Sequence, residues 1–179
     1  MANWAGDEFG GAELGDGRLR LRLIKLATRF AEQPTASIPG ACGDWAETVA
    51  AYRFFDQARA GKRGLNWQSI LQPHMDCSQR RMAQHPVVLC LQDTTELDFN
   101  GQEIEGLGPL SYEAQRGMYL HPTYAVTPER EPLGVIDAWM WAREAKAADG
   151  SRPGICESTR WIEGYERVAE TAAGMPQTR

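Results

Sequence analysis

The hydrophobic positions near the start of the chain recur at helical spacing. Between Asp16 and Phe30 the apolar side chains include Leu19, Leu23 and Leu26, which together form one stripe of a helix with 3.6 residues per turn. Asp16 stands where a helix N-cap is expected. The first six positions after Asp16 alternate as in a strand, but the longer pattern and the absence of proline favour a helix over residues 16–30.

Three further helices are predicted in the same half of the chain. Asp44 followed by Glu47 fits a capping box and predicts a helix to about Gln57, with Ala50 and Phe54 facing inward. The other two are a short helix over residues 4–9 and a longer one over about 67–84, interrupted or kinked at Pro73. Gly61 and Gly64 are expected to break the chain between helices. The first 85 residues therefore read as helical.

The pattern changes at Pro86. Residues 87–91 form a continuous apolar run, which is typical of a central strand buried on both faces. Glycine-rich residues 100–117 are expected to form a loop. Two extended segments, 118–126 and 133–143, flank a polar turn with a proline at each end and predict a hairpin. The last predicted element is a helix over about 157–173, with one side carrying Trp161, Tyr165, Val168 and Ala169.

Composition and charge refine this α+β prediction. The chain has 179 residues, of which 42% are hydrophobic, and a net charge of −5, values that suit a globular protein and do not by themselves suggest a nucleic-acid binder. However, residues 1–85 carry 11 basic and 9 acidic side chains, whereas residues 86–179 carry 8 and 15. We therefore assign two domains, 1–85 and 86–179, and consider their partners separately.

The positive charge is concentrated on one predicted helix. Residues 16–30 contain five basic side chains and one acidic side chain, and four of the basic ones repeat at i, i+4, i+7 and i+11. This basic stripe consists of Arg18, Arg22, Lys25 and Arg29. Such a stripe can follow a phosphate backbone. It can equally be a solvated helix face.

Asp93 is the strongest candidate for chemistry, because it ends the strand predicted to be central. A carboxylate there needs a partner, a hydrogen bond or a metal ion. A metal-binding or catalytic role and a turn-capping role, with hydrogen bonds from the amides of Thr94 and Thr95, are both open. Glu96 and Asp98 are near enough in sequence to share a cation with Asp93.

Other classes of function find little support. No apolar run approaches the roughly 18–20 residues of a membrane helix, and the first residues do not resemble a signal peptide. The cysteines at positions 42, 77, 90 and 156 lack metal-binding spacing, so reduced thiols are expected ahead of a disulfide or a zinc site. Structural roles are expected for His74, His85 and His121, and core packing for Trp139 and Trp141.

Several motifs, in order along the chain, resemble DDE transposases of the insertion-sequence-four family, in particular the transposon-five-like branch. The resemblance runs from about Trp4 to Arg167. The matching segments are Leu14–Arg18 with the basic helix after it, the Ala-Tyr-Arg-Phe-Phe string at 51–55, Gln92–Thr95, Arg116–Gly117, His121–Pro122, Pro132–Gly134, Trp139–Arg143, Glu157–Ser158 and Trp161–Tyr165.

This resemblance implies an N-terminal DNA-binding domain followed by the opening strand, hairpin and helix of a ribonuclease H-like core. In such enzymes three carboxylates hold two Mg²⁺ ions, which catalyse DNA cleavage and strand joining. Asp93 matches the first carboxylate and metal ligand. Arg18, Arg22 and Arg53 match basic positions or motifs of the DNA-binding domain, and Tyr52 is expected to pack. The implied partners are double-stranded transposon-end DNA and a second copy of the complete protein, in the bacterial cytoplasm and on its nucleoid.

The sequence departs from the family pattern after residue 167. The second catalytic Asp, on the strand after the last helix, and the later catalytic Glu have no match. We therefore expect an incomplete core that is inactive alone, with an unpaired sheet edge and exposed apolar surface. The alternatives are a non-catalytic DNA-binding or dimerising regulator of transposition, and a small α+β protein whose acidic half binds metal without touching DNA.

Overall fold

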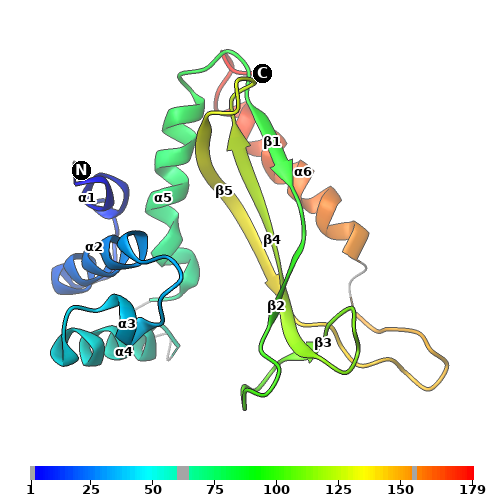
Figure 1. Ribbon diagram of the computed structural model, residues 1–179. Helices are drawn as coiled ribbons and strands as arrows, with labels where there is room; N and C mark the ends of the chain where they lie inside the picture. The colour runs from blue at the N-terminus through cyan, green and yellow to red at the C-terminus, as the bar shows by residue number, and fades with distance from the viewer. Residues whose placement is uncertain (1–2, 60–64, 155–156) are drawn as a thin grey trace. The chain divides into compact units, whose positions relative to one another are not determined.

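The computed structural model describes residues 3–59, 65–154 and 157–179. It confirms an α+β chain, with helices first and then an antiparallel sheet with one further helix (Figure 1). The elements are α1 (Trp4–Phe9), α2 (Gly17–Glu32), α3 (Ile38–Ala41), α4 (Trp45–Arg59), α5 (Trp67–Met82), β1 (Leu89–Gln92), β2 (Thr95–Asp98), β3 (Gly108–Pro109), β4 (Arg116–Val126), β5 (Pro132–Trp141) and α6 (Glu157–Ala173). The expected breaks at Gly61 and Gly64, and Cys156, lie outside the described residues.

The chain divides into two compact units, Met1–Cys77 and Ser78–Arg179. The division falls inside α5, before the boundary expected at residue 86. α5 continues past Pro73 to Met82, so the helix is not interrupted at this proline; the alternative, a kink there, stays a prediction. The two units are described separately below.

The first unit contains the predicted helices and also α3, which was not predicted. The predicted N-cap of α2 forms, whereas the capping box of α4 forms only in part, because the Glu47 side chain accepts from the Gly43 amide instead of the Asp44 amide. The Asp16 side chain accepts a hydrogen bond from the Arg18 amide at the start of α2. The Glu47 amide donates to Asp44 Oδ1 over 2.7 Å at the start of α4. Each cap satisfies one of the amides that a helix start leaves without a partner.

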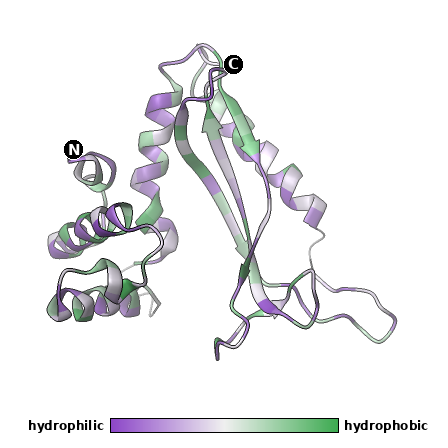
Figure 2. Ribbon diagram, viewed as in Figure 1, coloured by the Kyte–Doolittle hydropathy of each residue, from purple (hydrophilic) through white to green (hydrophobic). Residues whose placement is uncertain are grey.

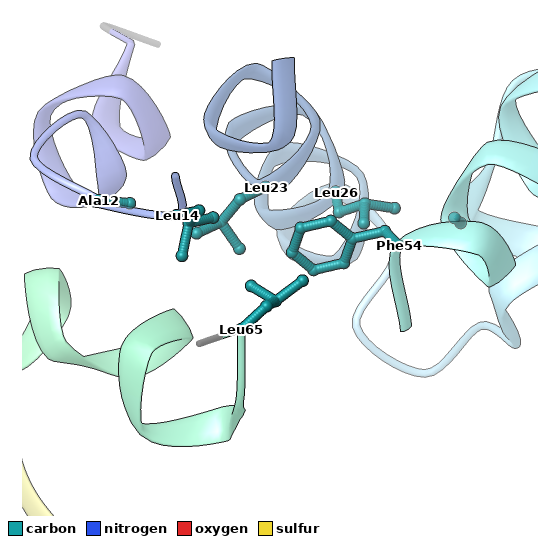
Figure 3. Packing of buried hydrophobic residues seen from close by; sticks show 7 residues of the cluster. Ala12, Leu14, Leu23, Leu26, Phe54 and Leu65 are labelled. Carbon is teal, nitrogen blue, oxygen red and sulfur yellow. The ribbon is translucent and has the colours of Figure 1, made fainter. Parts of the chain in front are cut away.

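The apolar stripes of these helices meet in one core (Figure 3). Leu23 and Leu26 from α2 and Phe54 from α4 are at most 5% exposed. Ala51, rather than the expected Ala50, is fully buried beside Phe54. The remaining buried members are Ala12, Leu14 and Leu65. The sides of α2 and α4 that face away from this core are therefore exposed to solvent, and they carry the candidate binding residues.

The second unit is an antiparallel sheet organised around β4. β1 and β5 both pair with residues 123–126 of β4, so they lie on opposite edges of that strand. β2 continues along the β1 edge, and the two-residue strand β3 pairs with the start of β4 on the other edge. The predicted hairpin of β4 and β5 is confirmed, and β2 and β3 were not expected.

The prediction that residues 87–91 form a central strand buried on both faces is wrong. Among the described strands β1 pairs with β4 alone. Leu89 and Leu91 are 45% and 51% exposed, whereas Cys90 points to the side where Met82 and Ala125 pack. β1 is apolar except at its last residue, Gln92 (Figure 2), but only alternate side chains are covered in the part of the unit that the structure describes. Apolar surface is thus exposed along β1, as expected.

α6 packs against β1 and β5 on one face of the sheet (Figure 1). The prediction that one side of this helix is apolar is only partly correct. Val168 packs against the core, but Tyr165 is 69% exposed, and the buried residue is Gly164. A Cβ at Gly164 would lie 2.2 Å from Gln92 Oε1, so the absence of a side chain lets the helix approach β1.

Gly117 provides a test of the sheet packing. A Cβ at this position would lie 2.2 Å from the Leu97 carbonyl oxygen and 2.9 Å from a Leu110 methyl carbon. Because backbone must move to relieve the overlap, we expect Gly117→Ala to lower the free energy of unfolding of the second unit by about 2–3 kcal/mol. Urea unfolding followed by near-ultraviolet circular dichroism measures this. Gly11→Ala is the control, since a Cβ there meets nothing within 4 Å; equal losses in both variants would contradict the account.

Candidate functional site

Three of the predicted DNA-binding arginines come together in the first unit. Arg18 and Arg22 from α2 and Arg53 from α4 line one open concavity of about 740 Å³. Its floor includes Phe54, which is anchored in the core. The other lining residues are Asp16, Leu19, Ala50, Asp56 and Gln57. We call this site the arginine concavity.

The Arg18 side chain is oriented although it is exposed. Its exposed fraction is 89%, and its Nη2 lies 2.8 Å from Asp16 Oδ2. Hydrogen bonding and charge attraction to Asp16 raise the pKa of Arg18. The same carboxylate caps α2, so the start of the helix and the guanidinium are held by one residue. Arg18 therefore presents a charged guanidinium, paired with Asp16, to the arginine concavity.

The other half of the predicted basic stripe has a different environment. Arg29 Nε donates to Glu47 Oε1 over 2.9 Å, and Lys25 Nζ lies 3.4 Å from Glu47 Oε2. The Glu47 side chain is 5% exposed and also accepts a hydrogen bond from the Gly43 amide. The stripe is therefore split: Arg18 and Arg22 line the concavity, whereas Lys25 and Arg29 neutralise a buried carboxylate. DNA contact by any of the four stays a prediction.

These contacts lower the pKa of Glu47 to about 2, with the Arg29 hydrogen bond as the largest cause and burial opposing it. Sequence reasoning assigned Glu47 only to a capping box. Its main partners lie 18 and 22 positions away on another helix, so no local pattern could have revealed them. Glu47 joins α2 to α4, the two helices that frame the arginine concavity.

Two aromatic residues of α4 are exposed. The expectation that Tyr52 packs is wrong, because Tyr52 is 47% exposed; Trp45, for which the sequence makes no prediction, is 77% exposed. The local signal for Tyr52 was available, because the predicted inward positions, Ala50 and Phe54, lie on the other side of the helix from it.

Asp93 lies in the second unit, in the break between β1 and β2. It is exposed, and its Oδ1 accepts a hydrogen bond from the Thr94 amide over 2.8 Å. The turn-capping alternative is therefore present in the structure, through one amide. A capping carboxylate at an exposed position keeps its remaining lone pairs available to other ligands.

The backbone beside Asp93 is held by a buried histidine. His121 of β4 is fully buried, with Nδ1 2.7 Å from Thr94 Oγ1 and Nε2 3.1 Å from Gln92 Oε1. Trp161 contacts the ring edge-to-face at 5.0 Å between centroids. Burial lowers the pKa of His121, and the charge of Asp93 opposes this shift. The expected structural role of His121 is confirmed: it ties both flanks of Asp93 to the central strand.

The other carboxylates near Asp93 in sequence have separate partners. Glu96 accepts hydrogen bonds from the Ser111 amide and the Tyr119 hydroxyl. Asp98 accepts from the Asn100 amide and the Gln115 side chain. Within residues 3–59, 65–154 and 157–179, no three His, Cys, Asp or Glu side chains gather into a metal-binding group. Metal binding by Asp93 therefore stays a prediction.

The remaining candidates have structural environments. Trp139 and Trp141 lie under α6, where the Arg167 guanidinium is 3.8 Å from the Trp139 ring centroid and Tyr119 stacks on Trp141. His74 stacks on Phe9 and contacts Glu8. Among the described residues, Cys42, Cys77 and Cys90 form no disulfide, and the Cys77 thiol lies 3.6 Å from the carbonyl oxygens of Asp7 and Glu8.

In the part of the chain that the structure describes, no helix has the length and apolarity needed to span a membrane.

Comparison with known proteins identifies a match in the first unit. Residues 1–60 match the family model described as transposase DNA-binding. The matched region contains α1 to α4 and every residue that lines the arginine concavity. The N-terminal part of this chain is thus similar to transposase DNA-binding domains, and this similarity supports a DNA-binding, transposase-related function.

Proposed function

We propose that the first unit binds the double-stranded end of a transposon at the arginine concavity. The observation that carries this proposal is the convergence of Arg18, Arg22 and Arg53, from two helices, within the segment that matches transposase DNA-binding domains. Guanidinium groups on a rigid frame suit phosphate oxygens, because they donate bidentate hydrogen bonds and keep their charge. Lys25 and Arg29 contribute less to the interface, since contact with DNA would draw them from Glu47, whose side chain is 5% exposed, whereas the Asp16 side chain that pairs with Arg18 is 20% exposed.

Binding of the 179-residue chain to a fluorescent duplex at increasing salt concentration tests this proposal. Each phosphate contact adds about 0.9 to the slope of log affinity against log salt. For contacts from Arg18, Arg22 and Arg53 we expect a slope of about −3. Affinity that does not change with salt, or no affinity at low salt, would overturn the proposal.

Asp56 opposes binding at this site. It is exposed, lines the arginine concavity and is acidic, so it repels phosphates that approach the arginines. We expect Asp56→Asn to tighten binding to any duplex by about two- to fivefold at low salt, and the gain to shrink as salt screens the charge. Fluorescence anisotropy measures this. Asp76→Asn, an exposed change on α5 outside the concavity, is the control, and equal gains in both variants would contradict the placement of the site.

For the second unit we propose the opening part of a ribonuclease H-like core. Its strand, hairpin and helix follow the order that the resemblance implies. After α6 the backbone returns beside the segment leading into β1: Arg179 N donates to the Pro86 carbonyl, and Val88 N donates to the Arg179 carbonyl. These two bonds flank Val87 in the pattern of parallel pairing. A strand in that direction after the last helix is what such a core requires.

In this proposal Asp93 is the first carboxylate of a Mg²⁺-dependent cleavage and joining site, and two copies of a complete transposase act on paired transposon ends. Because Asp93 alone cannot hold two metal ions, the 179-residue chain with Mg²⁺ is expected to leave supercoiled plasmid DNA intact. Gel electrophoresis of the plasmid measures this. Nicking that Asp93→Asn abolishes would contradict the expectation. If the 179-residue chain competes with a complete transposase for transposon-end DNA, this result would favour the alternative, a non-catalytic regulator of transposition.

A further inference from the structure

α4 has an exposed aromatic face that adjoins the arginine concavity. Trp45 and Tyr52 are 77% and 47% exposed. They are separated by two helical turns, so their side chains leave α4 within about 20° of each other. Asp56, one turn beyond Tyr52, lines the concavity. The aromatic face and the concavity are therefore neighbouring parts of one surface.

The opposite side of α4 is fixed. Ala51 and Phe54 are at most 2% exposed in the core of the first unit, and Glu47 is bonded to Arg29 of α2. An aromatic side chain on a helix held in this way loses little conformational freedom when it meets a partner. Large exposed aromatic side chains on such a rigid support are more typical of a recognition surface than of a helix face that contacts only solvent.

Charge indicates which partner this surface fits. The adjoining concavity presents Arg18, Arg22 and Arg53, so the partner carries negative charge beside a surface that accepts apolar contact. A DNA major groove has this combination, because phosphates border a floor that displays thymine methyl groups, and its width admits an α-helix. Phosphate contacts fix the register of a helix on DNA, and contacts to base edges select the sequence.

Accepting the proposed DNA-binding function, we infer that α4 lies in the major groove and that Trp45 and Tyr52 read the base sequence. The indole of Trp45 contacts thymine methyl groups, and Tyr52 contributes its ring and hydroxyl. Arg18 and Arg22 contact phosphates at the border of the groove and add affinity without selectivity.

The test begins with a pool of random 20-base-pair duplexes, from which the wild-type chain selects its preferred sequence. Affinities for the selected duplex and for a scrambled duplex are then compared. We expect Trp45→Ala and Tyr52→Ala each to weaken binding to the selected duplex about tenfold, to change binding to the scrambled duplex less than about twofold and to leave the salt slope unchanged. Trp45→Phe should retain most of the selectivity.

Two controls make the result specific. Arg22→Ala should weaken binding to both duplexes equally and reduce the salt slope by about 1. Tyr112→Ala removes an aromatic side chain that is 70% exposed in the second unit and should change neither affinity. Uracil in place of thymine in the selected duplex should weaken binding of the wild-type chain and have little further effect on Trp45→Ala.

The possible failures are distinguishable. If the aromatic variants keep full selectivity, or lose both affinities equally, α4 does not read the sequence and its aromatic face serves another contact, such as a protein partner. If the wild-type chain binds all duplexes equally and the salt slope is as expected, the inference fails, while DNA binding at the arginine concavity stands. If the chain binds no duplex, both fail.

Discussion

Glu47→Ala is expected to destabilise the first unit by about 2–3 kcal/mol, because it leaves Arg29 and Lys25 beside each other without their shared carboxylate. It also removes the acceptor of the Gly43 amide. Urea unfolding monitored by tryptophan fluorescence measures the loss. Glu32→Ala is a matched control, because Glu32 also pairs with Arg29 but its side chain is 50% exposed, and exposed pairs contribute at most about 1 kcal/mol. Similar losses in both variants would contradict the structural role of Glu47.

The same residue makes stability depend on pH. The pKa of Glu47 falls from 4.5 to about 2 on folding, so the folded state favours the ionised carboxylate. The stabilisation is therefore complete above the unfolded pKa and is lost as the pH falls from about 4.5 toward 2. Unfolding measured between pH 6 and pH 2.5 should show this loss in the wild-type chain and a smaller one in Glu47→Gln. Parallel curves would assign the acid sensitivity to other carboxylates.

The Arg18→Ala, Arg22→Ala double variant is expected to weaken binding to duplex DNA by at least about tenfold at low salt and to reduce the salt slope by about 2. It removes two guanidinium groups from the arginine concavity, one of which is the ion-pair partner of Asp16. Fluorescence anisotropy at several salt concentrations measures both effects.

The control for this variant must change net charge equally. Arg130→Ala with Lys146→Ala removes two positive charges from exposed positions of the second unit. It should reduce affinity less than about twofold, because screening limits the effect of distant charges. If both double variants weaken binding equally, affinity depends on total charge, and the arginine concavity is not the site.

The parts of the fold that the sequence predicts are those determined by interactions between residues close in sequence. The Asp16 cap and the spacing of Leu23 and Leu26 define α2 within a few residues. The polar turn between two extended segments defines the hairpin of β4 and β5. In each case the backbone hydrogen bonds and the buried stripe involve residues close in sequence, so their pattern is visible along the chain.

The parts that could not be predicted depend on tertiary contacts. The apolar run 87–91 has the same appearance whether one face or both are covered, and only the placement of α6 decides which side chains of β1 are buried. Likewise, Arg22 and Arg29 occupy one predicted stripe, but Glu47 lies near only one of them. The sequence therefore predicted the type of residue at the candidate site, but not which of the basic side chains come together there.

An NMR titration of the arginine side-chain Nε–H signals with duplex DNA follows binding at the arginine concavity one guanidinium at a time. We expect the signals of Arg18, Arg22 and Arg53 to shift together in proportion to bound DNA, while that of Arg29, held by Glu47, remains in place. Shifts confined to Arg29, or to arginines of the second unit, would contradict the account.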